Sequence, residues 1–211
     1  MRGVFVPGIE LSRRLYRDAV RPLPDLWRYV LACQWQRVGQ EEPFVGRCGE
    51  VGDELGSAVV AARLVRDLMR LCLLMGRRYP PYGKWLGSAF AALPDAGRLG
   101  PVLSAVLAAG AWRDREDRLV VAYETVAERH NELGLTARLD PGVRPFHDRP
   151  FRVLGTERFV RALVDGIGDP AVRALPLTGA VDQFVDSTDA LAHRARSRAL
   201  TAALYGGAQA G

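Results

Sequence analysis

The strongest constraint on the fold is one long apolar stretch, residues 50–78, which reads EVGDELGSAVVAARLVRDLMRLCLLMGRR and is ended by a Tyr-Pro pair. Apolar residues recur along it at the spacing of one helix face: Leu55, Val59, Ala62, Val65, Met69 and Cys72. Four further apolar residues widen that face: Leu64, Leu68, Leu71 and Met75. An apolar surface this broad is typical of a helix that is buried on most sides. The sequence therefore predicts a central helix around which the other elements pack.

A narrow polar stripe interrupts this helix. Its members follow each other at i, i+3, i+4 and i+7, so they share one edge: Arg63, Arg66, Asp67 and Arg70. Three arginines on a largely buried helix need partners or a wet cavity, because an unpaired buried charge is costly. Two interpretations follow, a structural ion-pair network or the anion-binding wall of a pocket.

The chain is mildly basic, and its positive charge comes almost entirely from arginine. It has 211 residues, with 29 basic and 24 acidic side chains and a net charge of +5, and Lys84 is the only lysine. This length suits one domain. Nucleic-acid binding is not expected, because no continuous basic block occurs. Arginine instead favours planar contacts with carboxylate or phosphate groups, which points to a small anionic ligand.

Cysteine and histidine show no spacing that is typical of a metal site or a disulfide framework. Cys33, Cys48 and Cys72 are an odd number in apolar surroundings, so we expect reduced core thiols. The histidines lie far from them and are not paired, so no metal is expected. Glycine-rich phosphate loops are missing, so we expect no cofactor. Apolar runs are too short for a signal peptide or a membrane span, which predicts a cytoplasmic protein without membrane contact.

The rest of the chain predicts helices separated by proline and glycine breaks. We expect them at 8–21, 26–39 with Asp25 as the cap, just after Glu41-Glu42-Pro43, and at 84–93, 98–109, 112–133, 156–166, 170–174 and 188–203. Residues 180–188 are ambiguous. Convincing alternating strands are absent, so the predicted fold is an all-α, single-domain helical bundle with one long Pro-rich loop. Its parts are an N-terminal helix and linker (1–24), a helical body (25–205) and a flexible tail (206–211).

The Pro-rich loop is the most unusual segment. Residues 140–153, DPGVRPFHDRPFRV, hold His147, Asp148 and Arg149 between two phenylalanines. We expect a loop that ends in a short strand at 151–154. His147 beside Asp148 suits an acid/base pair, and Arg149 suits an anion contact. The alternative is that the phenylalanines anchor the loop while its charges are solvated. His130, at the end of helix 112–133, is expected to cap that helix as a cation.

Two other clusters have both a functional and a structural interpretation. An aromatic corner brings together Tyr79, Tyr82, Lys84 and Trp85, which either line a pocket or form a packed corner. Polar residues gather between 182 and 189, where Ser187 or Thr188 as a helix cap accounts for part of the pattern. Calcium-loop spacing is absent there.

Several stretches, which together cover most of the chain, are distinctive: FVPGIELSRRLYRDAVRPL (5–23), LWRYVLACQWQRVGQEEPFVGRCGEVGDELGS (26–57), RLVRDLMRLC (63–72), RYPPYGKWLG (78–87), HNELGLT (130–136), RPFHDRPFRV (144–153) and GAVDQFVDSTD (179–189). They resemble a bacterial family of unknown function that normally follows a minimal nucleotidyltransferase domain. The resemblance implies a helical partner domain that helps to hold the substrate of a nucleotidyltransferase. In this chain Pro22–Pro24 runs straight into the helical part, and no D-x-D carboxylate pair follows Gly56-Ser57. We therefore expect no nucleotidyl transfer by this chain alone.

These observations predict a pocket formed by the central helix, the Tyr79–Trp85 corner and the 140–153 loop. The expected function is that of a cofactor-free enzyme or binding protein for a small anionic organic molecule. His147 with Asp148 would move protons, and Arg63, Arg66 or Arg70 would hold the anion. The alternative is a non-catalytic accessory module that binds a separate nucleotidyltransferase subunit through a large exposed apolar patch. The other expected protein partner is a second copy of the chain, in a homodimer. A third interpretation is a remnant without function.

Overall fold

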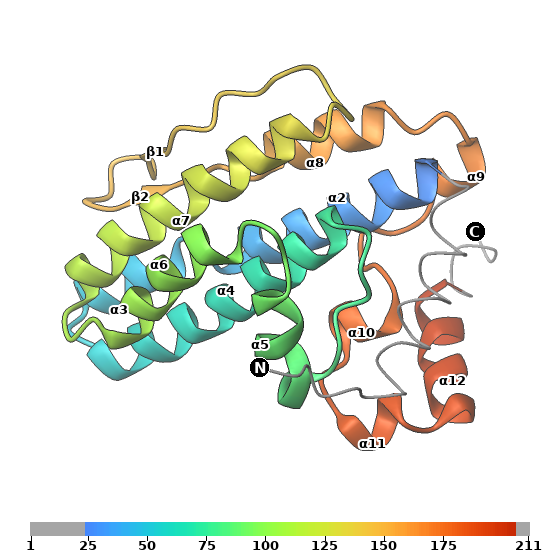
Figure 1. Ribbon diagram of the computed structural model, residues 1–211, viewed down its shortest axis with the longest axis horizontal. Helices are drawn as coiled ribbons and strands as arrows, with labels where there is room; N and C mark the ends of the chain where they lie inside the picture. Colours follow the sequence, from blue (N-terminus) through green and yellow to red (C-terminus); the bar gives the residue numbers. More distant parts are fainter. Residues whose placement is uncertain (1–23, 206–211) are drawn as a thin grey trace.

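A computed structural model describes residues 24–205, which form a bundle of helices (Figure 1). The helices are α2 (Pro24–Glu41), α3 (Phe44–Glu50), α4 (Glu54–Met75), α5 (Gly83–Ala91), α6 (Ala96–Ala108), α7 (Trp112–Glu132), α8 (Glu157–Asp165), α9 (Pro170–Arg173), α10 (Val181–Phe184), α11 (Thr188–Leu191) and α12 (Arg194–Tyr205). Two short antiparallel strands, β1 (Arg144–Pro145) and β2 (Arg152–Val153), pair within the Pro-rich loop. The predicted all-α fold is confirmed. The helix predicted at 8–21 and the tail at 206–211 lie outside the described residues.

Helix α4 lies at the centre of the bundle, as predicted. It packs against α2, α3, α5, α6 and α7. Its first turn is capped by the Asp53 carboxylate, which accepts a hydrogen bond from the backbone N–H of Gly56 at 2.7 Å. From Leu64 to Met75 almost every apolar side chain is buried. The other helices therefore surround the C-terminal half of α4.

The N-terminal half of α4 differs from the prediction. Leu55 and Val59, expected to face the core, have 76% and 54% of their surface exposed. The buried side of this half carries Ser57 instead, whose hydroxyl accepts a hydrogen bond from the Arg115 guanidinium of α7 at 2.8 Å. Neighbouring helices thus cover only one side of α4 near its start, and its first apolar stripe faces outward.

Helix α2 is the second buried element, and it packs mainly on α8 and α4. The Trp35 ring stacks on Phe159 of α8 at a centroid distance of 4.6 Å, and its indole N–H donates to Nδ1 of His130 at 3.2 Å. Burial lowers the pKa of His130 to about 4, so its ring is neutral at pH 7. The predicted role of a cationic His130 as a helix cap is wrong, because the ring points into the core.

Asp25 also has another role than the one expected. Helix α2 begins at Pro24, so Asp25 lies within its first turn rather than at the cap. Its carboxylate accepts hydrogen bonds from the backbone N–H groups of Gly168 and Asp169, at 3.0 and 2.8 Å. These bonds lower the pKa of Asp25. The carboxylate therefore ties the start of α2 to the segment between α8 and α9.

The Pro-rich loop is anchored at the end of the bundle formed by α3 and α7. Phe151 is buried against Gly46 of α3, where a Cβ atom would overlap the phenylalanine ring. Glu116 of α7 is buried and accepts hydrogen bonds from Arg152. This contact joins α7 to β2 across 36 positions of the sequence.

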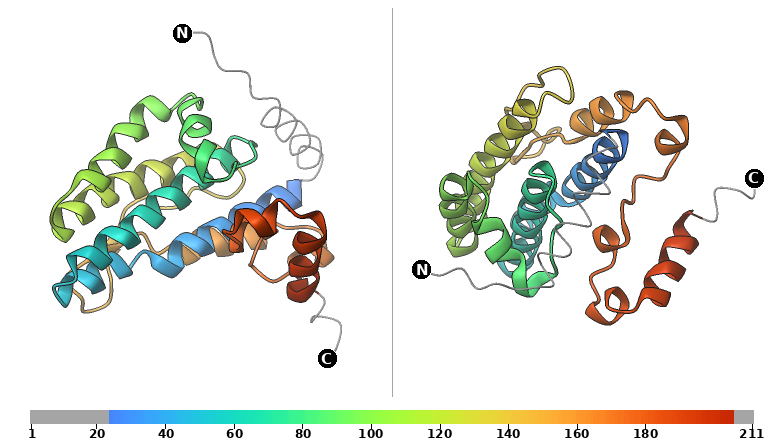
Figure 2. Two further views of the ribbon diagram at one scale, coloured as in Figure 1. Left: turned by 90° about the horizontal axis from the view of Figure 1, so that it is seen from below. Right: turned by 45° about the vertical axis from the view of Figure 1, so that its right-hand side comes forward.

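The C-terminal elements lie along one side of the bundle (Figures 1 and 2). The helix expected at 188–203 is broken at Ala192–His193 into α11 and α12, with Ser187 as the predicted cap of α11. Polar contacts tie this region to α2. The Tyr29 hydroxyl donates to the Pro176 carbonyl at 2.6 Å, and the buried Gln183 amide donates to the Val30 carbonyl at 3.2 Å.

None of the helices between residues 24 and 205 is both long enough and apolar enough to cross a membrane. Cys33, Cys48 and Cys72 are free thiols; Cys33 and Cys72 are buried as expected, whereas Cys48, also expected in the core, is half-buried.

Candidate functional site

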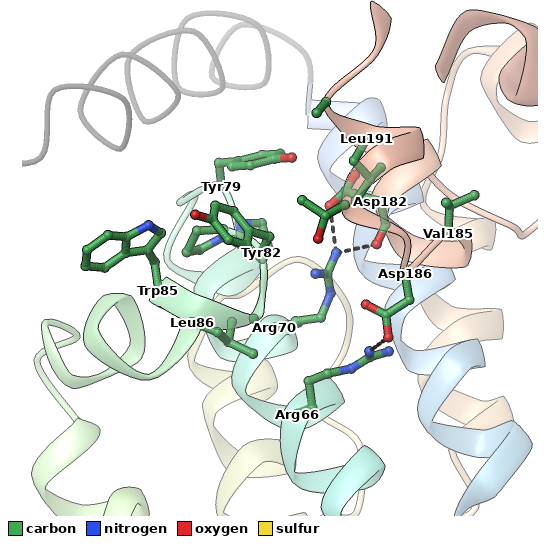
Figure 3. A pocket seen from close by; sticks show the side chains of 15 residues that line it. Arg66, Arg70, Tyr79, Tyr82, Trp85, Leu86, Asp182, Val185, Asp186 and Leu191 are labelled. Atoms are coloured by element: carbon green, nitrogen blue, oxygen red, sulfur yellow. Dashed lines mark hydrogen bonds and ion pairs between the residues drawn. The ribbon is translucent and has the colours of Figure 1, made fainter. Parts of the chain in front are cut away.

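A pocket of about 770 Å³ opens between the C-terminal half of α4, the start of α5 and the α10–α11 region (Figure 3). Its lining comes from three separate stretches of the sequence: Arg66, Arg70, Tyr79, Pro80, Pro81, Tyr82, Gly83, Trp85, Leu86, Asp182, Val185, Asp186, Thr188, Leu191 and Ala192. The cavity is of the size that small-molecule sites commonly have, about 300–1,000 Å³.

One wall of the pocket is aromatic. The consecutive prolines after Tyr79 keep the chain extended until α5 begins at Gly83, so Tyr79, Tyr82 and Trp85 all reach the same side of the cavity (Figure 3). Burial raises the pKa of Tyr79 to about 12, with Asp182 adding to the shift and Arg70 opposing it. The Tyr79 phenol is therefore protonated at pH 7. This wall offers flat apolar surface with hydroxyl groups at its edge.

The opposite side of the pocket is polar. Arg70 donates to the Asp182 carboxylate at 2.6 Å and to the Asp182 backbone carbonyl at 2.8 Å. Both side chains are close to fully buried, with 10% and 12% exposed. One turn earlier on α4, Arg66 pairs with Asp186, whose side chain is 82% exposed. The arginines project from α4 toward the α10–α11 region, and the aspartates meet them there (Figure 3).

The polar stripe of α4 continues beyond the pocket as an ion-pair network. Arg63 binds Glu41 of α2 with its Nε 2.8 Å from the carboxylate, and Arg37 of α2 reaches both Glu41 and Asp67. Burial raises the pKa of Asp67, while the neighbouring arginines, Arg66 first, oppose the shift. The stripe is therefore paired, as the network interpretation predicted, and two of its arginines also line a cavity. Ligand binding by these residues stays a prediction.

The sequence-predicted residues divide into two groups. The structure brings together Arg66, Arg70, Tyr79, Tyr82 and Trp85 around the pocket. The other six lie outside its lining, three of them in the 140–153 loop. Arg63 and Asp67 belong to the network next to it, and the Lys84 ammonium lies 5.1 Å from the centroid of the Trp85 ring on an exposed side chain.

The expectation that the 140–153 loop forms part of this pocket is wrong. No residue of the loop belongs to the lining, and β1 and β2 lie at the opposite end of the bundle from α11 (Figure 1). His147 and Asp148 are exposed, and Arg149 pairs with Glu50 of α3 at 3.6 Å. The physical reason is the anchoring of Phe151 on Gly46 and of Arg152 on Glu116, which directs the loop to the α3–α7 end. A role for His147 and Asp148 in proton transfer at the pocket is therefore not supported.

Asp182 and Asp186 were missed as site residues. Their spacing contained a usable signal, because two aspartates four residues apart match two arginines four residues apart on α4. In the sequence they looked like the polar start of a helix. Their pairing with α4 depends on the path of the chain after α9, which periodicity does not reveal.

Within the described part of the chain, no group of three or more His, Cys, Asp or Glu side chains is arranged to hold a metal ion.

Comparison with known proteins finds a family model that matches part of the chain. Neither the curated proteins nor the solved structures contain a match to this chain. Residues 6–86 match the model of a family described as a domain of unknown function (DUF4037). That stretch contains α4 and the whole aromatic wall of the pocket. The predicted resemblance to a family of unknown function is thus confirmed, and residues 6–86 are similar to DUF4037.

Proposed function

We propose that this chain binds a small organic molecule with a flat apolar part in the pocket between α4, α5 and the α10–α11 region. One observation carries the proposal, the position of three aromatic side chains opposite two arginine–aspartate pairs in one cavity. Ligand sites usually combine apolar and aromatic walls with a few polar groups that fix orientation.

Binding is favoured over acid/base catalysis. The lining contains no histidine, cysteine or lysine, and both of its carboxylates are paired with arginines. Tyr79 holds its proton at pH 7 because burial raises its pKa to about 12. His147 and Asp148, which the sequence predicted as a proton-transfer pair, lie outside the lining. The pocket is therefore better suited to holding a molecule than to moving protons.

The test is a binding screen of small aromatic compounds by saturation-transfer-difference NMR, followed by a variant of the aromatic wall. Tyr82 is 48% exposed, so Tyr82→Ala should leave the fold intact. Losing one stacking partner should weaken binding by about twofold to tenfold. Phe44→Ala is the matched control, because Phe44 is an aromatic side chain of similar exposure, 39%, outside the lining. The proposal fails if no compound binds, or if Tyr82→Ala and Trp85→Ala both leave binding unchanged.

A second candidate is an accessory module for a nucleotidyltransferase acting in trans. The outward stripe of α4 favours it, since Leu55 and Val59 lie on one face and Val51, just before the helix, is 80% exposed. The occupant would be a minimal nucleotidyltransferase domain such as the one that precedes the family this chain resembles. Sedimentation of the chain with such a domain should show a complex that Leu55→Asp abolishes. If the two proteins sediment separately, or if the complex also forms with the Leu55→Asp variant, this role is ruled out.

A further inference from the structure

The two arginines of the pocket are held in different ways. Arg70 binds both the carboxylate and the backbone carbonyl of Asp182 on α10. The backbone oxygen cannot leave unless α10 moves, and α10 is fixed on α2 by Gln183, whose amide donates to the Val30 carbonyl and to Gln34, each at 3.2 Å. Arg70 therefore stays paired with Asp182 unless α10 moves.

Arg66 pairs with two carboxylates, one buried and one exposed to solvent. Asp67, with 2% of its side chain exposed, lies 3.5 Å from the Arg66 guanidinium and 3.5 Å from Arg37. Asp186 pairs with Arg66 from the pocket side, with 82% of its side chain exposed. Asp186 sits between α10 and α11, outside both helices. Exposed ion pairs of this kind add little stability, so Asp186 is the partner that can leave.

Departure of Asp186 would change the charge of the pocket without disordering Arg66. The lining contains two arginines and two aspartates, so its charges balance. Once Asp186 turns away, one positive charge is left facing the aromatic wall. The buried Asp67 still holds the guanidinium in place, and a positioned guanidinium can bind an incoming carboxylate through two parallel hydrogen bonds.

We propose that the pocket takes a flat aromatic acid whose carboxylate replaces Asp186 on Arg66, so that Asp186 is a built-in competitor of the ligand. This inference rests on the proposed binding function and adds the charge of the ligand to it. The aromatic body would lie against Tyr79, Tyr82 and Trp85. The acid group would lie on the polar side of the cavity, where Asp186 lies in the structure.

Three probes that share the indole ring system and differ in charge test the inference. They are indole-3-acetate, indole-3-acetamide and tryptamine, which carry a negative, a neutral and a positive group. Dissociation constants would be measured on the full chain by isothermal titration calorimetry. We expect indole-3-acetate to bind most tightly and tryptamine most weakly. Asp186→Asn removes the competitor and should tighten indole-3-acetate binding by about twofold to fivefold, the range that an exposed ion pair can supply.

The controls separate local competition from a general charge effect. Asp189→Asn makes the same charge change on an exposed residue three positions away, outside the lining, and should leave all three constants unchanged. Arg66→Gln should remove the preference for indole-3-acetate over indole-3-acetamide. Asp186 is exposed, so its variant is expected to keep the melting temperature of the parent chain.

The outcomes distinguish this inference from the proposed function. Equal binding of the three probes, with no effect of Asp186→Asn, would overturn the inference and leave the binding function standing. Tighter binding of tryptamine, weakened by Asp186→Asn, would also overturn it and assign a cationic ligand. If no probe binds to the parent chain or to Asp186→Asn at millimolar concentration, the inference fails; the aromatic-ligand function fails with it only if no compound of the aromatic screen binds either.

Discussion

At the scale of single residues, Arg70 joins two parts of the chain that are distant in sequence. Its bonds to Asp182 join residues 112 positions apart, and both partners are largely withdrawn from water. Removing one member of a buried pair leaves the other charge without compensation, which typically costs about 3–5 kcal/mol. We therefore expect Arg70→Ala to lower the free energy of unfolding, measured with urea, by roughly 3 kcal/mol.

Arg63→Ala provides the matched comparison for Arg70. Arg63 is also paired with a carboxylate, that of Glu41, but 48% of the Arg63 side chain is exposed. Its loss should cost less than about 1 kcal/mol, because water screens the pair. A loss for Arg70→Ala as small as the one expected for Arg63→Ala would show that the contact between α4 and α10 does not stabilise the protein.

Glu42 gives a second prediction at this scale, on pH. Its buried carboxylate accepts hydrogen bonds from the backbone N–H groups of Leu154, Gly155 and Thr156, yet burial raises its pKa from 4.5 to about 7. The folded chain thus holds a proton there that the unfolded chain releases. This contribution to stability is complete below pH 4.5 and is lost as the pH rises through 7. It amounts to about 3 kcal/mol.

The measurement compares Glu42→Gln with the parent chain in urea unfolding at several pH values between 5 and 8. The parent should lose stability relative to the variant as the pH rises. His130, whose pKa burial lowers to about 4, works in the opposite direction but is present in both proteins and cancels in the difference. If the free energy of unfolding changes with pH in the same way for both proteins, the raised pKa of Glu42 is contradicted.

At the scale of elements, the position of the Pro-rich loop depends on the absence of a side chain at Gly46 of α3. Gly46 leaves room for the ring and Cβ of Phe151, and a methyl group there would overlap both. We expect Gly46→Ala to destabilise the protein by about 1–3 kcal/mol, as overpacking does. Hydrogen exchange at the backbone N–H of Arg152 should accelerate, because the anchor of β2 is lost.

The control for this prediction is Gly97→Ala in α6. Gly97 also lies in a helix, but no atom comes within 4 Å of the position that a Cβ would take. The substitution should be neutral or stabilising by up to about 1 kcal/mol, since alanine favours helices. If both variants were equally stable, Phe151 would not be the anchor of the loop.

The elements also show which parts of the fold the sequence predicts. The long helices were found because their apolar periodicity is strong, and Gly134, with a φ of +63° just after α7, accounts for where that helix ends. The break at Ala192–His193 was missed because neither residue is a helix breaker. The direction of the loop was missed because it depends on the packing of Phe151 on Gly46, a contact between distant segments that no local pattern marks.

For the candidate site, the sequence identified one wall and only part of the other. Tyr79, Tyr82 and Trp85 are close in sequence and come together through local geometry. Arg66 and Arg70 were recognisable because a charged stripe on an apolar helix needs an explanation. Their aspartate partners come from a segment that reaches α4 only through the path of the chain around α2.

At the scale of the whole molecule, the 211-residue chain is expected not to transfer nucleotides by itself. Its sequence lacks the D-x-D pair that bridges two metal ions in such enzymes. Incubation with ATP, magnesium and labelled acceptors should release no pyrophosphate above background. Metal-dependent release that survives repurification would show that the chain contains a transferase centre of another kind.

The two walls of the pocket differ in how much of the protein depends on them. The aromatic wall adjoins α4 and shares the apolar core with Leu86 and Phe90. The facing wall belongs to α10 and α11, whose side chains are mostly exposed or half-buried and whose links to the bundle are largely polar. Substitutions at Val185, Thr188 or Leu191 can therefore reshape the cavity without touching the packed interior. The same bundle could accommodate different ligands through changes in a few residues near its C-terminal end.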